Sequence, residues 1–103
     1  MKLVRDLIPQ IIEEDGKSCV YHIAVSSEYK ARLYKKMDEE LNEFVEDPCC
    51  EEAADIYEVL SALCCFHKID MELVKTTAAN KRKERGGFEG RIILEKVVDK
   101  SRG

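Results

Sequence analysis

Two groups of acidic residues in the middle of the chain have a spacing that can bind a divalent cation. The first group contains Glu40 and Glu43, and the second contains Glu52 and Asp55. In each group the two carboxylates are three residues apart, so in a helix they project from one face. Two such helices packed antiparallel would bring four carboxylates together, and hard divalent cations prefer such an oxygen-rich environment. These four residues are therefore candidate metal ligands.

The surroundings of two of these acids favour a metal site over an ordinary charged surface. Acidic residues three apart are common on solvated helix faces, and spacing alone does not separate the two interpretations. On helical wheels, however, Glu40 falls within the apolar stripe of its helix and Glu52 within that of the next. An ionised carboxylate against apolar surface is costly unless it is compensated, and no Lys or Arg shares these arcs closely enough to serve all four acids. A bound cation would compensate them.

A second group of residues could bind phosphate. Lys81 and Arg85 are four residues apart and share a helix face, so both could contact one polyphosphate. The alternative is that they only offset the dipole at the end of their helix. Arg5 is a further candidate for phosphate binding. Glu39 lies outside the apolar stripe of its helix, and it is either a solvated side chain or a group that orients or deprotonates a water molecule.

Three long helices are predicted to position these residues. The chain has no Gly or Pro between Ser26-Ser27, which supply an N-cap, and Pro48, and its apolar spacing predicts a helix over about residues 27–46. A second helix is predicted to start after Pro48, to run through residues 51–66 and to end around Lys68. A third is predicted over residues 71–85, between Asp70 as its cap and the Gly86-Gly87 pair that ends it.

The segments outside these helices are less regular in sequence. Residues 3–14 are expected to form a short helical or turn-like arm that ends at Asp15-Gly16. Residues 19–25 are rich in β-branched and aromatic types and are expected to be extended, either paired with their copy in another subunit or irregular. The tail at residues 88–98 is expected to form a short helix or strand that packs its apolar residues on the helices.

Length and composition predict one all-α domain over residues 1–103. The net charge of −4 gives no reason to bind a nucleic acid polymer or an anionic membrane. No apolar run approaches the roughly 20 residues that cross a bilayer, so a cytoplasmic location is expected. The five cysteines are expected to be reduced thiols, with Cys64 packed in a helix interface and Cys65 less buried.

Four stretches, in this order, resemble the MazG-like all-α nucleoside triphosphate pyrophosphohydrolases, which are related to phosphoribosyl-ATP pyrophosphohydrolase. The matching stretches are residues 2–12, residues 39–44, residues 51–59 and residues 81–88. The resemblance implies a helical bundle that hydrolyses a nucleotide between its α and β phosphates and releases pyrophosphate. It also implies Mg²⁺ held by Glu40, Glu43, Glu52 and Asp55, and assembly as a homodimer or homotetramer.

The sequence leaves several alternatives open. The substrate could be phosphoribosyl-ATP, or the chain could be a non-catalytic helical module that dimerises or binds nucleotide without cleaving it. The small size of the chain indicates that a partner subunit completes the nucleotide pocket. The preference for base and sugar cannot be read from the sequence, because it depends on contacts that the sequence does not place.

Overall fold

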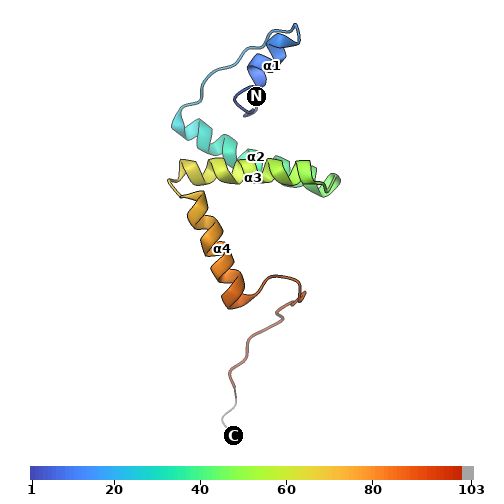
Figure 1. The fold of residues 1–103 in the computed structure, drawn as a ribbon, viewed down its shortest axis with the longest axis vertical. Helices are drawn as coiled ribbons and strands as arrows, with labels where there is room; N and C mark the ends of the chain where they lie inside the picture. The colour runs from blue at the N-terminus through green and yellow to red at the C-terminus, as the bar shows by residue number, and fades with distance from the viewer. Residues whose placement is uncertain (101–103) are drawn as a thin grey trace. The chain divides into compact units, whose positions relative to one another are not determined.

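The computed structural model describes residues 1–100, and within them the chain forms four α-helices and no strand (Figure 1). The helices are α1 (Ile8–Glu14), α2 (Ser26–Glu46), α3 (Cys50–Phe66) and α4 (Met71–Arg85). The predicted all-α class is confirmed, and the predicted bounds of the three long helices differ from these by about two residues at most. No helix in this part of the chain is both long enough and apolar enough to cross a membrane.

The contacts within the chain divide it into two compact units. The first unit is Met1–Met71, with α1, α2 and α3, and the second begins at Glu72. The prediction of a single domain over residues 1–103 stays a prediction. The candidate metal ligands all belong to the first unit.

The first unit is built on the pair formed by α2 and α3. These helices pack against each other and are joined only by residues 47–49, so they form an antiparallel hairpin. Pro48 lies in this connection, where a missing backbone N–H does no harm. The start of α2 differs from the prediction in one respect, because Val25 takes the N-cap position and makes no side-chain capping bond. The hairpin brings the C-terminal half of α2 beside the start of α3.

The core of this hairpin is small. Among the described residues, the buried apolar side chains are Leu33, Val59 and Cys64. The Tyr29 and Phe66 rings add an edge-to-face contact with centroids 5.7 Å apart. The predicted burial of Cys64 is confirmed, while Cys65 is exposed and all five cysteines are free thiols.

The N-terminal segment is held on the hairpin by polar contacts. The Arg32 guanidinium donates a hydrogen bond to the carbonyl oxygen of Met1 at 3.0 Å, and Arg5 forms an ion pair with Asp55. The predicted arm is confirmed, since residues 6 and 7 form a turn that leads into α1. Residues 17–25 then form neither helix nor strand within this chain, and the alternative in which residues 19–25 pair with their copy in another subunit stays a prediction.

The second unit contains α4 and the residues after it. Gly86 ends α4 with φ +84, a left-handed conformation that glycine adopts at little cost, as the Gly86-Gly87 pair predicted. Arg82 donates a hydrogen bond to Glu89 at 2.5 Å across this turn. The expected short helix or strand in the tail is wrong, because residues 91–100 form neither. Their apolar side chains are exposed, and a short segment keeps no regular structure without a surface that buries it.

Candidate metal centre

The α2–α3 hairpin brings the four predicted metal ligands together. Glu40 and Glu43 lie one turn apart on α2, and Glu52 and Asp55 lie one turn apart on α3. Each residue offers one carboxylate oxygen to a cluster in which these atoms all lie within 4.8 Å of one another. The antiparallel packing predicted from the two acidic groups therefore produces a set of four oxygen donors that could hold a metal ion.

Two oxygen atoms of this cluster are buried and have no hydrogen-bond partner. Glu40 is only 5% exposed, and its Oε2 atom is one of them; Oε2 of Glu52 is the other. Both residues were predicted to lie within apolar helix faces; Glu40 is buried as a whole, whereas Glu52 is half-buried with one buried oxygen atom. A buried polar atom without a partner costs about 1–3 kcal/mol, and such atoms are rare in folded proteins. A cation bound between the helices would satisfy both.

The environment also makes two of the carboxyl groups harder to ionise. Burial raises the pKa of Glu40 above its ordinary value, and neighbouring Glu43 raises it further, whereas Lys36 opposes the shift. The pKa of Glu52 is raised first by loss of solvation and then by the negative charges of Asp55 and Glu40. The cluster thus concentrates more negative charge than its surroundings stabilise.

Two cations already contact the cluster. Nη2 of Arg5 lies 2.6 Å from Oδ1 of Asp55, and Nζ of Lys36 lies 3.2 Å from Oε1 of Glu40. Four ionised carboxylates against these two cations leave two uncompensated negative charges. A divalent cation carries the charge that would balance them.

The structure places the other predicted site residues as follows. Glu39 lies outside the four-residue cluster, and its Oε2 atom is 3.7 Å from Nζ of Lys36. Arg5 lies at Asp55, at the edge of the acidic cluster. Lys81 and Arg85 lie on α4, in the second unit, and both are exposed. Their predicted contact with phosphate stays a prediction, as does the catalytic role of Glu39.

Sequence reasoning missed Lys36 as a member of the site. Its spacing of four residues from Glu40 on one helix was a usable signal, because such pairs meet on a helix surface. The Arg5–Asp55 pair had no such signal, because 50 residues separate its partners. Only the folding of the N-terminal segment onto the hairpin brings them together.

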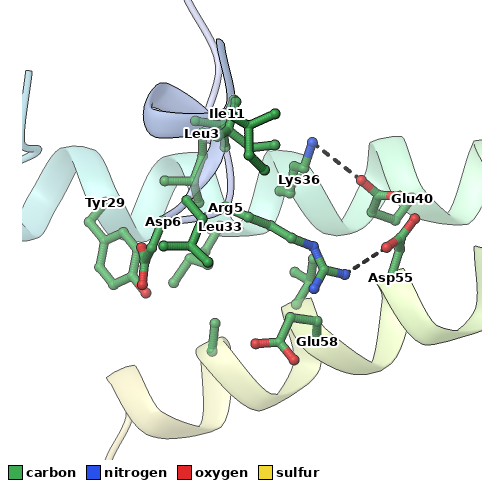
Figure 2. Close-up of a pocket in the computed structure, with 15 residues that line it drawn as sticks. Leu3, Arg5, Asp6, Ile11, Tyr29, Leu33, Lys36, Glu40, Asp55 and Glu58 are labelled. Atoms are coloured by element: carbon green, nitrogen blue, oxygen red, sulfur yellow. Dashed lines mark hydrogen bonds and ion pairs between the residues drawn. The ribbon is translucent and has the colours of Figure 1, made fainter. Parts of the chain in front are cut away.

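A cavity of about 500 Å³ adjoins the acidic cluster within the first unit. It lies between the N-terminal segment, α2 and α3, and Figure 2 shows residues that line it. Much of its wall is apolar, contributed by Leu3, Ile8, Tyr29, Leu33, Val59 and Ala62. Glu40 and Asp55 belong to both the cavity wall and the cluster, so a ligand in the cavity would touch the candidate metal ligands.

The arrangement combines an all-oxygen donor set with an adjoining pocket of mixed polarity. Carboxylate oxygens select hard cations such as Mg²⁺, Ca²⁺ and Mn²⁺ over the softer metals that thiolate ligands favour. Such a centre can bind phosphate groups and promote their hydrolysis. No protein-family model, no curated protein and no solved structure matches the chain.

Proposed function

We propose that this chain is a Mg²⁺-dependent nucleotide pyrophosphohydrolase that releases a nucleoside monophosphate and pyrophosphate. The observation that carries the proposal is the cluster of four carboxylates with two buried, unpartnered oxygen atoms, on Glu40 and Glu52. An acidic cluster on a helix surface would be solvated and would not need an ion. This one is partly buried, and its two neighbouring cations leave it two charges short of balance.

The choice of Mg²⁺ and of a nucleotide rests on chemistry and on the sequence resemblance together. Mg²⁺ takes oxygen ligands and commonly completes its coordination with substrate phosphates and water. The resemblance to the MazG-like pyrophosphohydrolases supplies the triphosphate substrate and the bond that is cleaved. It rests on the acidic groups and on residues 2–12 and 81–88.

Each site residue would have a definite task. Glu40, Glu43, Glu52 and Asp55 would hold the ion, which when bound neutralises phosphate charge and activates water. Lys81 and Arg85 would bind the polyphosphate and stabilise the charge that develops on the leaving pyrophosphate. Arg5 would contact phosphate from its position beside Asp55.

Glu39 would orient the attacking water or accept its proton. It is partly exposed and next in sequence to Glu40, and its Oε2 atom lies 3.7 Å from Nζ of Lys36. Water would thereby be added across the anhydride between the α and β phosphates, which yields the two products.

The test is hydrolysis of a panel of canonical and modified nucleoside triphosphates, and of phosphoribosyl-ATP, with Mg²⁺ and detection of pyrophosphate. The wild-type protein should turn over at least one triphosphate and should lose this activity in EDTA. Glu40→Gln, Glu52→Gln and Asp55→Asn should each abolish turnover and weaken Mg²⁺ binding in calorimetric titration while the protein stays folded, because each removes a ligand charge.

The matched control is Glu46→Gln, which makes the same charge change at an exposed position of the same helix as Glu40. This variant should hydrolyse and bind Mg²⁺ like the wild type. If two of the three ligand variants keep wild-type turnover, the metal assignment is wrong. If only phosphoribosyl-ATP is hydrolysed, the alternative substrate replaces the nucleoside triphosphates.

A further inference from the structure

The cavity beside the acidic cluster is larger than a metal site requires. Its volume of about 500 Å³ falls within the range of roughly 300–1,000 Å³ that is typical of small-molecule sites. Because Glu40 and Asp55 line it, a substrate whose phosphates reach the cluster has the rest of its structure in or next to this space. The side chains of the cavity wall would therefore contact the part of the substrate beyond its phosphates.

The wall has the character of a site for a flat, partly apolar group. The Leu33 and Val59 side chains form a buried apolar surface, and the Tyr29 ring also lines the cavity. Figure 2 shows Glu40 and Asp55 at one end of the group of lining residues and Tyr29 at the other. A nucleobase suits such a wall, because aromatic and aliphatic side chains pack against the faces of its ring.

Two carboxylates in this wall have no partner within the described residues. Asp6 and Glu58 both line the cavity, and neither makes a hydrogen bond or an ion pair with another described residue. Figure 2 shows Asp6 at the end where Tyr29 lies and Glu58 between the two ends. An ionised carboxylate only accepts hydrogen bonds. It therefore favours a ligand edge that presents N–H donors and disfavours one that presents carbonyl oxygens.

We propose that the cavity under the N-terminal segment binds the base of the nucleotide, and that Asp6 and Glu58 select bases that carry an exocyclic amino group. This inference rests on the proposed function, since it assumes that the phosphates lie at the acidic cluster. It goes further in naming a substrate class: cytosine, adenine or guanine nucleotides over those of uracil and hypoxanthine. Asp6 and Glu58 are specificity residues, and the hydrolysis itself does not need them.

The test uses two pairs of substrates in which an amino group is replaced by an oxo group, CTP with UTP and ATP with ITP. In at least one pair the wild-type protein should prefer the amino member by about tenfold or more in kcat/KM, because the oxo member sets a carbonyl against a carboxylate. The double variant Asp6→Asn/Glu58→Gln should reduce this ratio to about threefold or less, because an amide both donates and accepts. Glu46→Gln should keep the wild-type ratio.

Binding of the products separates this inference from the proposed function. The affinities of CMP, UMP, AMP and IMP are measured by calorimetry in the presence of Mg²⁺, without any need for turnover. If no triphosphate is hydrolysed but AMP binds better than IMP or CMP better than UMP, the proposed function fails and the base site stands. The base site would be overturned if the amino and oxo members of each pair were hydrolysed and bound about equally well. It would also be overturned if the double variant left the wild-type preference unchanged. Hydrolysis itself could continue in either case.

Discussion

Glu40 is 5% exposed, which places it with Leu33 at 2% and Val59 at 8% and not with the other acids of the chain. One of its carboxylate oxygens forms an ion pair with Lys36, and the other has no hydrogen-bond partner. At the scale of single residues, the site thus depends on a carboxylate that the fold buries before any ligand is present. Such a group lowers the stability of the metal-free protein when it is ionised, so the stability should depend on pH.

We expect Glu40 to make the metal-free protein less stable as the pH rises. Burial raises the pKa of Glu40 above 4.5, so the folded state holds this proton more tightly than the unfolded state. The free energy of unfolding should therefore fall as the pH rises from 4.5 through the folded pKa, and stay low above it. In Glu40→Gln this fall should be smaller. At pH values above that window, the free energy of unfolding of the variant should exceed that of the wild type by about 1 kcal/mol or more.

Urea denaturation in EDTA, from about pH 4 to pH 8, measures this difference. The pKa of Glu28 is lowered, chiefly by its hydrogen bond with His22, and that of Glu89 is lowered by Arg82, so both shift stability in the opposite direction. These two groups are present in both proteins and cancel in the comparison. A difference between wild type and Glu40→Gln that does not change with pH would contradict the prediction. Saturating Mg²⁺ should reverse the order of stability.

At the scale of elements, α2 and α3 carry the acidic cluster, and α4 carries the basic residues. Packing explains α2 and α3, which share the buried side chains of the first unit. It does not explain α4, which has no buried residue and carries Arg82, Lys83 and Arg85 in its last turn. Cations there stabilise the helix dipole, so the effect of Lys81 and Arg85 on stability must be separated from an effect on catalysis.

The double variant Lys81→Gln/Arg85→Gln separates the two roles. If these residues bind the polyphosphate, kcat/KM should fall about tenfold or more, which corresponds to at least ~1.4 kcal/mol of transition-state binding. The melting temperature should then stay close to that of the wild type. If they only offset the helix dipole, stability should drop by about 1 kcal/mol or less with catalysis nearly intact. Normal hydrolysis with early melting would leave the phosphate contact to Arg5 or to a second copy of the chain.

At the scale of the whole molecule, the buried apolar surface is small for the number of apolar residues. The described part of the chain buries Leu33, Val59 and Cys64, while α2 exposes Leu41 and Val45, which lie on one face four residues apart. Exposed apolar surface of this kind is typical of a face that another subunit covers.

We expect a homo-oligomer, and a dimer is the simplest one. Sedimentation equilibrium at micromolar concentration should give at least twice the monomer mass of 11.8 kDa. The variant Leu41→Lys/Val45→Lys should shift the protein toward the monomer, because two buried charges in an interface are costly. A monomeric wild-type protein would refute the prediction. An unchanged mass in the variant would move the interface to another face.

The sequence by itself determined the three long helices and the four metal-ligand candidates. Helical periodicity is a local property, so the positions of Glu40 and Glu52 within apolar stripes could be read directly, and both proved to have a buried oxygen atom. The same holds for Cys64. The tail after Gly90 was predicted wrongly, because the regularity of a short apolar segment depends on the surface that buries it and not on its own residues.

Only the tertiary structure decided which groups from distant parts of the chain lie beside the acids. The Arg5–Asp55 pair joins residues far apart in the chain, and the cavity forms between the N-terminal segment and the helix hairpin. Neither follows from any repeat or spacing, because both depend on the path of an irregular segment that no periodic pattern encodes. Local periodicity thus fixes which side chains share a helix face, whereas the partners of those side chains depend on how distant segments pack.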